Sequence, residues 1–238
     1  MGRIFEKRKD RMFARWAKNA KAFTKVGKEI SIAIKLGGSD PGGNPRLRAA
    51  IQTARSLNMP KDRIEAAVKR ASGKEEADLH EVFYSGYAPH GVALFITTAT
   101  DNPTRTVANV RSILGSHNGS MSSAGALDYL FRRLGVFKVK APAGALDELE
   151  LALIDCGLEE MEQVDEDLHI YADFNQFGAM QRELENRKLE VLSAGSEQVP
   201  ASTVQVTPEQ ENEIRELLDA LEEDDDVQHV FHNMLEGV

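Results

Sequence analysis

Apolar residues recur at three- and four-residue steps through the first part of the chain. Between residues 11 and 36 this stripe consists of Trp16, Ala20, Phe23, Val26, Ile30 and Ala33. Such spacing places every member on one face of an α-helix, so it predicts a helix over residues 11–36 with that face turned toward a core. Gly37-Gly38 marks the expected end, because glycine readily adopts the left-handed conformation on which helices often terminate.

Two further helices are expected before residue 76. Asn44-Pro45 is a start signal, since Asn caps a helix and proline at the first helical position loses no hydrogen bond. The inward apolar residues of this helix are Leu47, Ala50, Ile51, Ala54 and Leu57. Asn58-Met59-Pro60 starts the next helix, which ends near Gly73 and turns inward Ile64, Ala67, Val68 and Ala71. Residues 1–76 are therefore predicted to form a three-helix domain.

Beyond residue 90 the pattern changes to short apolar strands that alternate with helices. The expected order from residue 136 onward is strand, helix, strand, strand, helix, strand, over 136–140, 145–156, 158–163, 168–172, 174–186 and 190–196. This βαββαβ order is typical of the ferredoxin-like fold, in which one antiparallel sheet is backed by two helices.

The segments on either side predict a second set of elements. Before it we expect a strand at 92–96, a helix at 102–114 and a strand at 127–131; after it, a strand at 203–206, a helix at 208–221 and a strand at 227–231. Joined, they give βαββαβ again. We therefore predict an α+β protein of three domains: a basic helical domain (1–76), a discontinuous α/β domain (77–136 and 203–238), and a ferredoxin-like α/β domain inserted in it (137–202).

Charge is divided unequally along this plan. The net charge of −9 combines 19 basic and 6 acidic residues in 1–74, a balance of +13, with 10 basic and 32 acidic residues in the remaining 164, a balance of −22. Such asymmetry suggests an anionic partner for the basic part, and the alternative is that both parts are merely solvated surfaces.

The basic residues of the first predicted helix are also ordered in space. Lys18 lies about 200° around the helix from Trp16, at about 100° per residue, so the basic stripe is opposite the apolar one. Arginines on the outer side of the next helix extend this surface. The candidate nucleic-acid-binding residues are Arg11, Arg15, Lys18, Lys21, Lys25, Lys28, Arg46, Arg48 and Arg55.

The inserted segment shares its element order with RNA-recognition modules but differs from them in charge. Residues 137–202 carry 5 basic and 15 acidic residues, and His169-Ile170-Tyr171-Ala172 lacks the Lys/Arg-Gly-aromatic pattern of a base-stacking strand. Such a surface repels phosphate. We expect it to contact a basic protein, a second copy of the chain through self-association of the acidic domains, or the basic helical domain itself.

Catalytic and metal-binding interpretations are weak. His229 and His232 lie three residues apart in a predicted strand, where side chains alternate, so they point to opposite faces and do not suggest a metal site. Asp101, Arg105 and His90 show no nucleophile–base spacing, and Cys156 falls on an apolar helix face. We predict no enzymatic activity and no cofactor or metal.

Nothing in the sequence indicates a membrane. No apolar run approaches the roughly 20 residues of a membrane span, and the first residues lack the apolar segment of a signal peptide. A single cysteine, Cys156, rules out an intrachain disulfide and fits a reducing compartment. The expected location is the cytoplasm.

Many short motifs give the chain a family resemblance. They are Phe23-Thr24-Lys25, Gly37-Gly38-Ser39-Asp40-Pro41, Asn44-Pro45-Arg46-Leu47-Arg48, Asn58-Met59-Pro60-Lys61-Asp62, Gly86-Tyr87, Thr100-Asp101-Asn102, Arg105-Thr106 and Asp225-Asp226-Val227-Gln228-His229-Val230. In this order they resemble the YebC-like proteins from about Phe23 to the C-terminus. That family is described as probable transcriptional regulators in bacteria, and its mitochondrial relatives act as translational activators.

The resemblance implies a helical domain, two α/β domains and a DNA-binding regulator of transcription. Its alternative is a ribosome-associated translation factor whose basic helices contact ribosomal RNA. The sequence departs from the family pattern at two places. The usual Gly-His-Ser-Lys-Trp opening is replaced by a different basic opening over 1–22, and His90 stands where the family tends to have a glycine.

Overall fold

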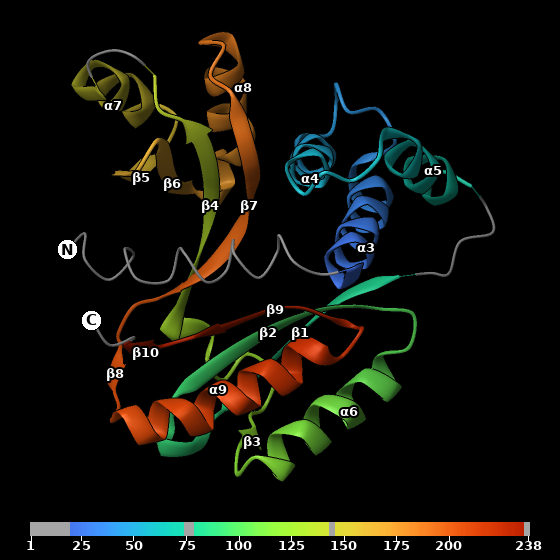
Figure 1. Ribbon diagram of the computed structural model, residues 1–238, viewed down its shortest axis with the longest axis vertical. Coiled ribbons are helices and arrows are strands. Elements are labelled where there is room, and N and C mark those ends of the chain that lie inside the picture. The colour runs from blue at the N-terminus through green and yellow to red at the C-terminus, as the bar shows by residue number, and fades with distance from the viewer. Residues whose placement is uncertain (1–19, 74–78, 143–145, 236–238) are drawn as a thin grey trace.

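The computed structural model describes residues 20–73, 79–142 and 146–235 (Figure 1). Its first part is a bundle of three helices: α3 (Ala20–Gly37), α4 (Pro45–Ser56) and α5 (Lys61–Ala71). Val26, Ile30 and Ala33 of α3 pack against Leu47 of α4 and Ile64 of α5, as the hydrophobic spacing predicts. The part of the predicted first helix before residue 20 lies outside the described residues.

Asn44 ties the end of the first helix to the start of the second. Its side-chain oxygen accepts the Leu47 amide at 3.0 Å, and its side-chain nitrogen donates to the carbonyls of Ala33 and Gly38 at 2.7 and 2.8 Å. Gly38 has a φ of 84°, as expected of a residue that terminates a helix. The predicted cap and stop signals are confirmed here.

The inserted domain has the predicted βαββαβ order. Its elements are β4 (Phe131–Lys140), α7 (Leu146–Ile154), β5 (Leu158–Val164), β6 (Asp167–Asp173), a 3-10 turn (Phe174–Gln176), α8 (Phe177–Asn186) and β7 (Val191–Pro200). The strands pair in the order β5-β6-β4-β7, and every pair is antiparallel. Both helices pack on one face, over a core that includes Phe137, Leu153, Ile170, Met180 and Leu184.

The remaining elements form a second antiparallel sheet. They are β1 (His80–Tyr87), a 3-10 turn (Pro89–Gly91), β2 (Ala93–Thr100), α6 (Pro103–Ser116), β3 (Ser120–Met121), a 3-10 turn (Asp128–Leu130), β8 (Val204–Gln205), α9 (Pro208–Glu223), β9 (Val227–His232) and β10 (Met234–Leu235). The sheet order is β3-β1-β2-β9, with α6 and α9 packed on one face. The short strands β8 and β10 pair separately, in parallel.

This second sheet differs from the predicted βαββαβ order in four places. Strand β3 was not expected, and the strand predicted at 203–206 lies outside the sheet as β8; the other two differences are β1 and residues 127–131. Strand β1 was not expected, because a segment containing Glu81, Ser85 and Gly86 has little apolar periodicity; its pairing along the whole of β2 makes it a strand. Residues 127–131 were expected to be a strand but form a 3-10 turn leading into β4. Leu127 and Phe131 are buried there as core anchors, whereas Asp128 and Tyr129 are exposed.

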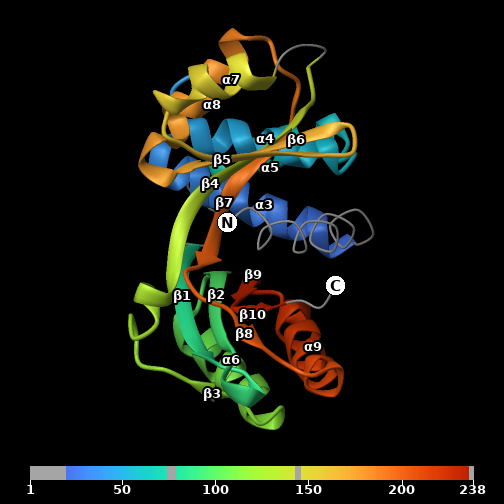
Figure 2. The same cartoon turned by 90° about the vertical axis from the view of Figure 1, so that its left-hand side faces the viewer.

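Two long strands join the inserted domain to the second sheet. Figure 2 shows β4 and β7 running from the upper half of the molecule, where the helical and inserted domains lie, to the lower half formed by the discontinuous α/β domain. The boundary expected between residues 136 and 137 therefore lies within β4. Helix α4 packs along β7: Thr53 Oγ1 donates to the Ala194 carbonyl at 3.3 Å, and Ala49 belongs to the core of the inserted domain.

Candidate nucleic-acid interface

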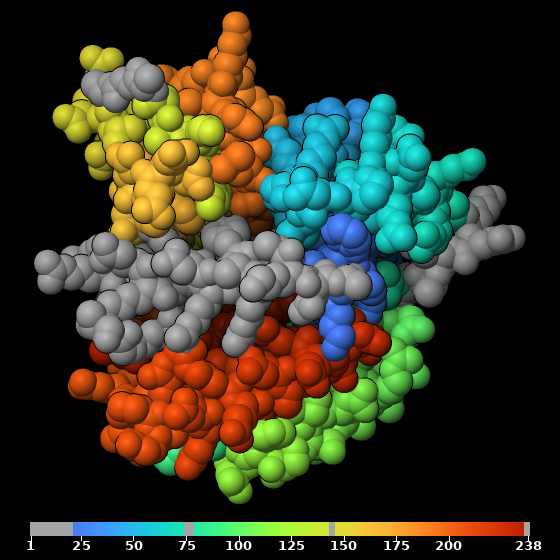
Figure 3. Space-filling model, in the orientation of Figure 1, coloured from blue at the N-terminus to red at the C-terminus, as the bar shows by residue number. Residues whose placement is uncertain are grey.

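The basic face of α3 is turned toward the discontinuous α/β domain. The ammonium of Lys21 donates to the Glu223 carbonyl at 3.0 Å, and that of Lys25 donates to the Glu222 and Gln228 carbonyls at 3.3 and 3.4 Å. In Figure 3 the blue end of α3 lies against the red C-terminal segment. The sequence predicted the helical face correctly, but the structure places both ammonium groups against protein oxygens, with Lys25 partly buried and Lys21 exposed at the rim.

The C-terminal end of α9 attracts the ammonium groups of Lys21 and Lys25. The last four carbonyls of a helix have no partner within it and carry the negative end of the helix dipole. Helix α9 has no basic residue in its last turn, and the acidic run 222–226 follows at that end. Lys21 and Lys25 therefore supply from another domain the cations that this helix end lacks. Burial lowers the pKa of Lys25 and the Lys21 charge adds to this, whereas Glu222 opposes it.

Lys28 reaches the centre of a buried polar cluster. Its ammonium donates to the carbonyls of Ala99 and Asp225 at 3.0 and 2.8 Å and to Asp226 Oδ1 at 3.0 Å, which uses all three of its N–H groups. Asp226 Oδ2 also accepts from Arg105 at 2.9 Å, from Thr106 at 2.8 Å and from Thr100 at 3.2 Å. Burial alone would raise the pKa of Asp226, but the hydrogen bonds from Arg105, Lys28 and Thr106 outweigh it and lower that pKa to about 2.

Arg46 bridges the helical domain and β1. Its guanidinium lies 2.7 Å from Glu29 Oε1 and 2.6 Å from Glu81 Oε1, and each carboxylate receives two hydrogen bonds from the guanidinium. Burial would lower the pKa of Arg46, but the paired carboxylates of Glu29 and Glu81 raise it well above its usual value. A guanidinium held by two carboxylates is neutralised, so it attracts phosphate weakly.

The other candidate residues have different environments. Arg48 donates to the Pro41 and Gly42 carbonyls at 2.6 and 2.8 Å, and its Nε lies 3.2 Å from Glu185 of the inserted domain. Arg55, near the end of α4, is exposed. Arg11, Arg15 and Lys18 lie outside the described residues.

A set of exposed cations was missing from the candidate residues. Helix α5 carries Lys61, Arg63, Lys69 and Arg70, all exposed, and its acidic residues are Asp62 and Glu65. Arg63 and Arg70 are seven residues apart, about two turns, and therefore share one face. The charge balance of residues 1–74 includes these cations, but they lie outside the periodic basic stripe of the first predicted helix.

A cleft of about 750 Å³ lies where the three domains meet. Its described walls carry the cations Lys21, Lys25, Arg46, Arg133 and Arg215 and the acids Glu29, Glu81, Glu197, Asp219, Glu222 and Glu223. The guanidinium carbon of Arg133 lies over the Phe174 ring, 3.7 Å from its centroid. With five cations and six acids, this lining gives no net attraction for a polyanion.

The histidines behave as expected of strand residues. In β9, His229 pairs with Thr97 and His232 with Leu94, which places their side chains on opposite faces of the sheet. Burial, with Lys25 and Arg46 nearby, lowers the pKa of His229 to about 3. Within residues 20–73, 79–142 and 146–235, no cluster of three or more His, Cys, Asp or Glu is placed to hold a metal. Cys156 packs at the edge of the inserted-domain core.

Comparison with known families identifies the architecture. A model described as the TACO1/YebC protein N-terminal domain matches residues 3–74, and one described as the TACO1/YebC second and third domain matches residues 79–234. The chain belongs to the TACO1/YebC family. The resemblance seen in the sequence motifs is thereby confirmed.

Family relatives match over nearly their whole length. A probable transcriptional regulatory protein of Anaeromyxobacter dehalogenans is 55% identical over 98% of this chain and 100% of its own. One of the same description from Flavobacterium johnsoniae is 48% identical over 99% of this chain and 100% of its own. The crystal structure of a conserved hypothetical protein from Aquifex aeolicus matches with a TM-score of 0.78 and 38% identity, over 90% of this chain and 89% of that one.

The family motifs acquire a structural meaning. Thr100, Arg105, Thr106 and Asp226 come from three separate motifs and meet in the polar cluster around Lys28. His90, where TACO1/YebC proteins tend to have glycine, has a φ of 64°, a conformation that glycine adopts without cost. Its Nε2 lies 2.8 Å from Glu213 Oε2. No helix in the described part of the chain is long and apolar enough to cross a membrane.

Proposed function

We propose that this protein is a non-enzymatic, cytoplasmic regulator of gene expression that binds nucleic acid through the outer face of its helical domain. The names of its relatives support a role in transcription, and hence DNA as the ligand. The alternative is a ribosome-associated translation factor that contacts ribosomal RNA. Both use the same cations, because contacts to phosphate carry no sequence information.

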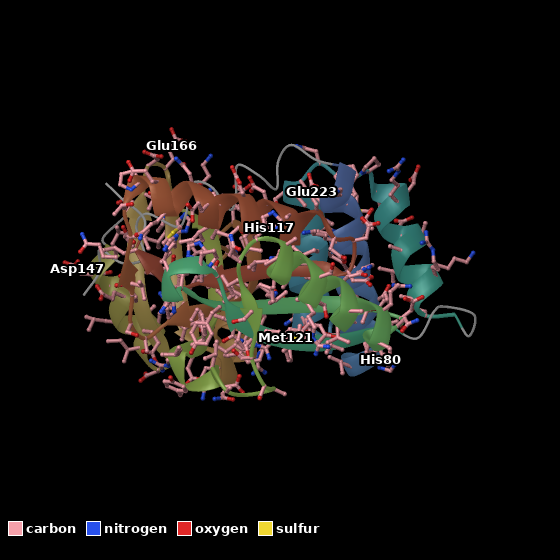
Figure 4. The ribbon with its side chains drawn as sticks, turned by 90° about the horizontal axis from the view of Figure 1, so that it is seen from below. His80, His117, Met121, Asp147, Glu166 and Glu223 are labelled. Atoms are coloured by element: carbon pink, nitrogen blue, oxygen red, sulfur yellow. The ribbon has the colours of Figure 1, made fainter. Side chains whose placement is uncertain are left out.

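The observation that carries this proposal is the exposed positive charge of α4 and α5. These two helices expose Arg55, Lys61, Arg63, Lys69 and Arg70 and contain two acidic residues, Asp62 and Glu65. The remaining domains are strongly acidic, so phosphate is attracted to this side of the molecule. Figure 4 places Asp147 and Glu166 on the side away from the helical domain, which separates the two charged regions further.

The salt dependence of binding tests the proposed surface. Each phosphate neutralised on duplex DNA contributes about −0.9 to the slope of log Kobs against log salt. Replacing Arg63 and Arg70 by Ala should weaken binding of the intact chain to all sequences and reduce the slope by about 2. The matched control is Lys140→Ala with Arg182→Ala, which removes two exposed cations from the inserted domain. If the two double variants weaken binding equally, or if neither weakens it, then the outer face of α4 and α5 is not the binding surface.

Sedimentation of cell lysate separates the two ligands. Retention on chromosomal DNA that is lost with DNase supports the transcriptional role. Co-migration with ribosomes that survives DNase and is lost with RNase supports the translational role. The Arg63→Ala, Arg70→Ala variant should lose whichever association the intact chain shows.

A further inference from the structure

The helical domain contacts its two neighbours in different ways. Against the inserted domain the contact has an apolar centre, with Ala49 of α4 inside that domain's core, beside the Thr53–Ala194 hydrogen bond and the Arg48–Glu185 ion pair. Against the discontinuous α/β domain the described hydrogen bonds of α3 are made by the ammonium groups of Lys21, Lys25, Lys28 and Lys35. A polar contact of this kind is weakened by salt and by competing anions, whereas an apolar core is not.

The partner of the lysines resembles a phosphate backbone in its chemistry. Carbonyl oxygens of residues 222, 223, 225 and 228 and one carboxylate oxygen of Asp226 surround the three ammonium groups. The side chains of residues 222–226 add five consecutive negative charges to the negative end of the α9 dipole. Glu223 lies beside α3 at this helix end (Figure 4).

We propose that residues 222–226 act as an internal substitute for phosphate, which holds Lys21, Lys25 and Lys28 in a closed state and withholds them from nucleic acid. This regulation rests on the proposed function: the exposed cations of α4 and α5 bind nucleic acid in either state, and the lysines of α3 in the same domain are the regulated ones. Nucleic acid first binds the exposed cations of α4 and α5, and its phosphates then compete for the three lysines. Opening adds lysine contacts, so binding and domain separation are coupled.

The connection between the domains permits such opening. The helical domain remains attached to the inserted domain through its apolar contact, and β4 and β7 join this pair to the sheet below (Figure 2). Gly135 of β4 and Gly195 of β7 occupy adjacent positions of this ladder, paired with Ser196 and Val136. Both glycines lie inside the sheet, where Gly135 also pairs with Ala172 of β6 and packs against the Phe177 ring. The ribbon that leaves the sheet is residues 131–133 of β4 paired with residues 198–200 of β7, beyond the last β6 pair, and two strands alone bend more easily than a full sheet.

A cleavable cross-link tests the closed state without removing a lysine. Thr24 and Asp225 are both exposed and line the same small cleft, and Asp225 contacts Lys28 through its backbone carbonyl alone. In a Cys156→Ser background, Thr24→Cys and Asp225→Cys are joined by a bis-maleimide that contains a disulfide. Binding to duplex DNA is measured before and after cleavage by a reductant.

Cleavage of the linker should tighten binding by about 10-fold at low salt and steepen the salt slope by up to about 3, one for each released lysine. Spin labels on the same two cysteines should move apart when saturating duplex is added. Equal binding before and after cleavage, or an unchanged label distance at saturation, would overturn the closed state and leave the proposed function standing. Absence of binding in every form would instead overturn the proposed function, and the closed state with it.

Neutralising the acidic run gives an independent measurement. Glu222→Gln with Glu223→Gln retains the carbonyls but weakens the negative potential, so binding should tighten by about 3-fold or more. The matched control is Glu209→Gln with Glu211→Gln, in the first turn of the same helix, about 18 Å away at 1.5 Å per residue. That distance exceeds the Debye length of about 8 Å in physiological salt. Equal tightening in both variants would show a net-charge effect and contradict the proposal.

Discussion

Lys28 and Asp226 are 198 residues apart in the chain, yet the lysine Nζ lies 3.0 Å from the aspartate Oδ1. The aspartate side chain is 9% exposed and the lysine side chain 18%. This pair connects the helical domain to the discontinuous α/β domain. The other aspartate oxygen, Oδ2, accepts hydrogen bonds from Thr100, Thr106 and Arg105, so both oxygens of the carboxylate have partners.

Asp226→Asn should destabilise the protein by about 2 kcal/mol near neutral pH. The folded-state pKa of about 2 lies below the ordinary 3.8, and each unit corresponds to about 1.4 kcal/mol. Because the folded pKa is depressed, this contribution is complete above about pH 4 and is lost as pH falls from about 4 to 2. Urea unfolding at pH 7 and pH 3 measures it. Asp101→Asn, which removes an exposed partner of the same Arg105, should cost less than about 1 kcal/mol.

His229 gives a second pH window. Burial, with Lys25 and Arg46 nearby, lowers its folded pKa from 6.5 to about 3, so between these values the unfolded chain binds more protons than the folded one. Stability from the neutral imidazole is therefore complete above about pH 6.5 and declines as pH falls toward 3. Gln in place of His229 should flatten the stability profile between pH 6.5 and 4.5. An unaltered profile in the His229 variant would contradict the assignment.

Local signals predicted much of this fold. Asn44-Pro45 and Asn102-Pro103 each start a helix with the Asn side chain accepting an amide three residues later, as their sequence indicates. The element order of the inserted domain was predicted correctly, and its two central strands, β4 and β6, carry apolar runs that are buried in the structure. Strand β1 was missed because its strand character comes from pairing with β2, which is not visible in the local pattern.

The sequence predicted that the candidate site is a basic helix face, but not which part of the protein that face contacts. Periodicity placed Lys21, Lys25 and Lys28 on one helix face. It carried no information on which surface would meet that face, because the oxygens they contact lie about 70 to 200 residues further along the chain. The acidic run 222–226 was evident in the sequence, and opposite charge between two distant segments was the available signal. The prediction that these lysines contact phosphate stays a prediction, to be tested with the cross-linked protein.

Gly86→Ala should destabilise the second sheet by about 1 to 3 kcal/mol. A Cβ at Gly86 would run into the backbone carbonyl oxygen of Ser120, with the Leu114 side chain 3.3 Å away, so β3 would have to move. Gly115→Ala is the control, because nothing lies within 4 Å of its added Cβ and alanine favours the helix by up to about 1 kcal/mol. Thermal unfolding of both variants measures the difference. A neutral Gly86→Ala would show that β3 moves freely at this edge.

Arg46 distinguishes a structural cation from a phosphate-binding one. Its planar guanidinium forms two hydrogen bonds to Glu29 and two to Glu81, a geometry that lysine does not reproduce. Arg46→Lys should therefore cost about 1 kcal/mol or more of stability, and Arg46→Ala about 2 kcal/mol, because it leaves two carboxylates facing each other in a partly exposed site. Neither variant should make the salt slope of duplex DNA binding shallower once the unfolded fraction is subtracted, because Arg46 contributes no phosphate contact and loss of its bridge to Glu81 favours release of the three lysines. Glu29→Gln with Glu81→Gln in the Arg46→Ala background should recover part of the lost stability, since it removes the repulsion. If Arg46→Ala instead retains stability and reduces the slope by about 1, then Arg46 leaves its carboxylates to bind phosphate, and the structural role assigned to it is wrong.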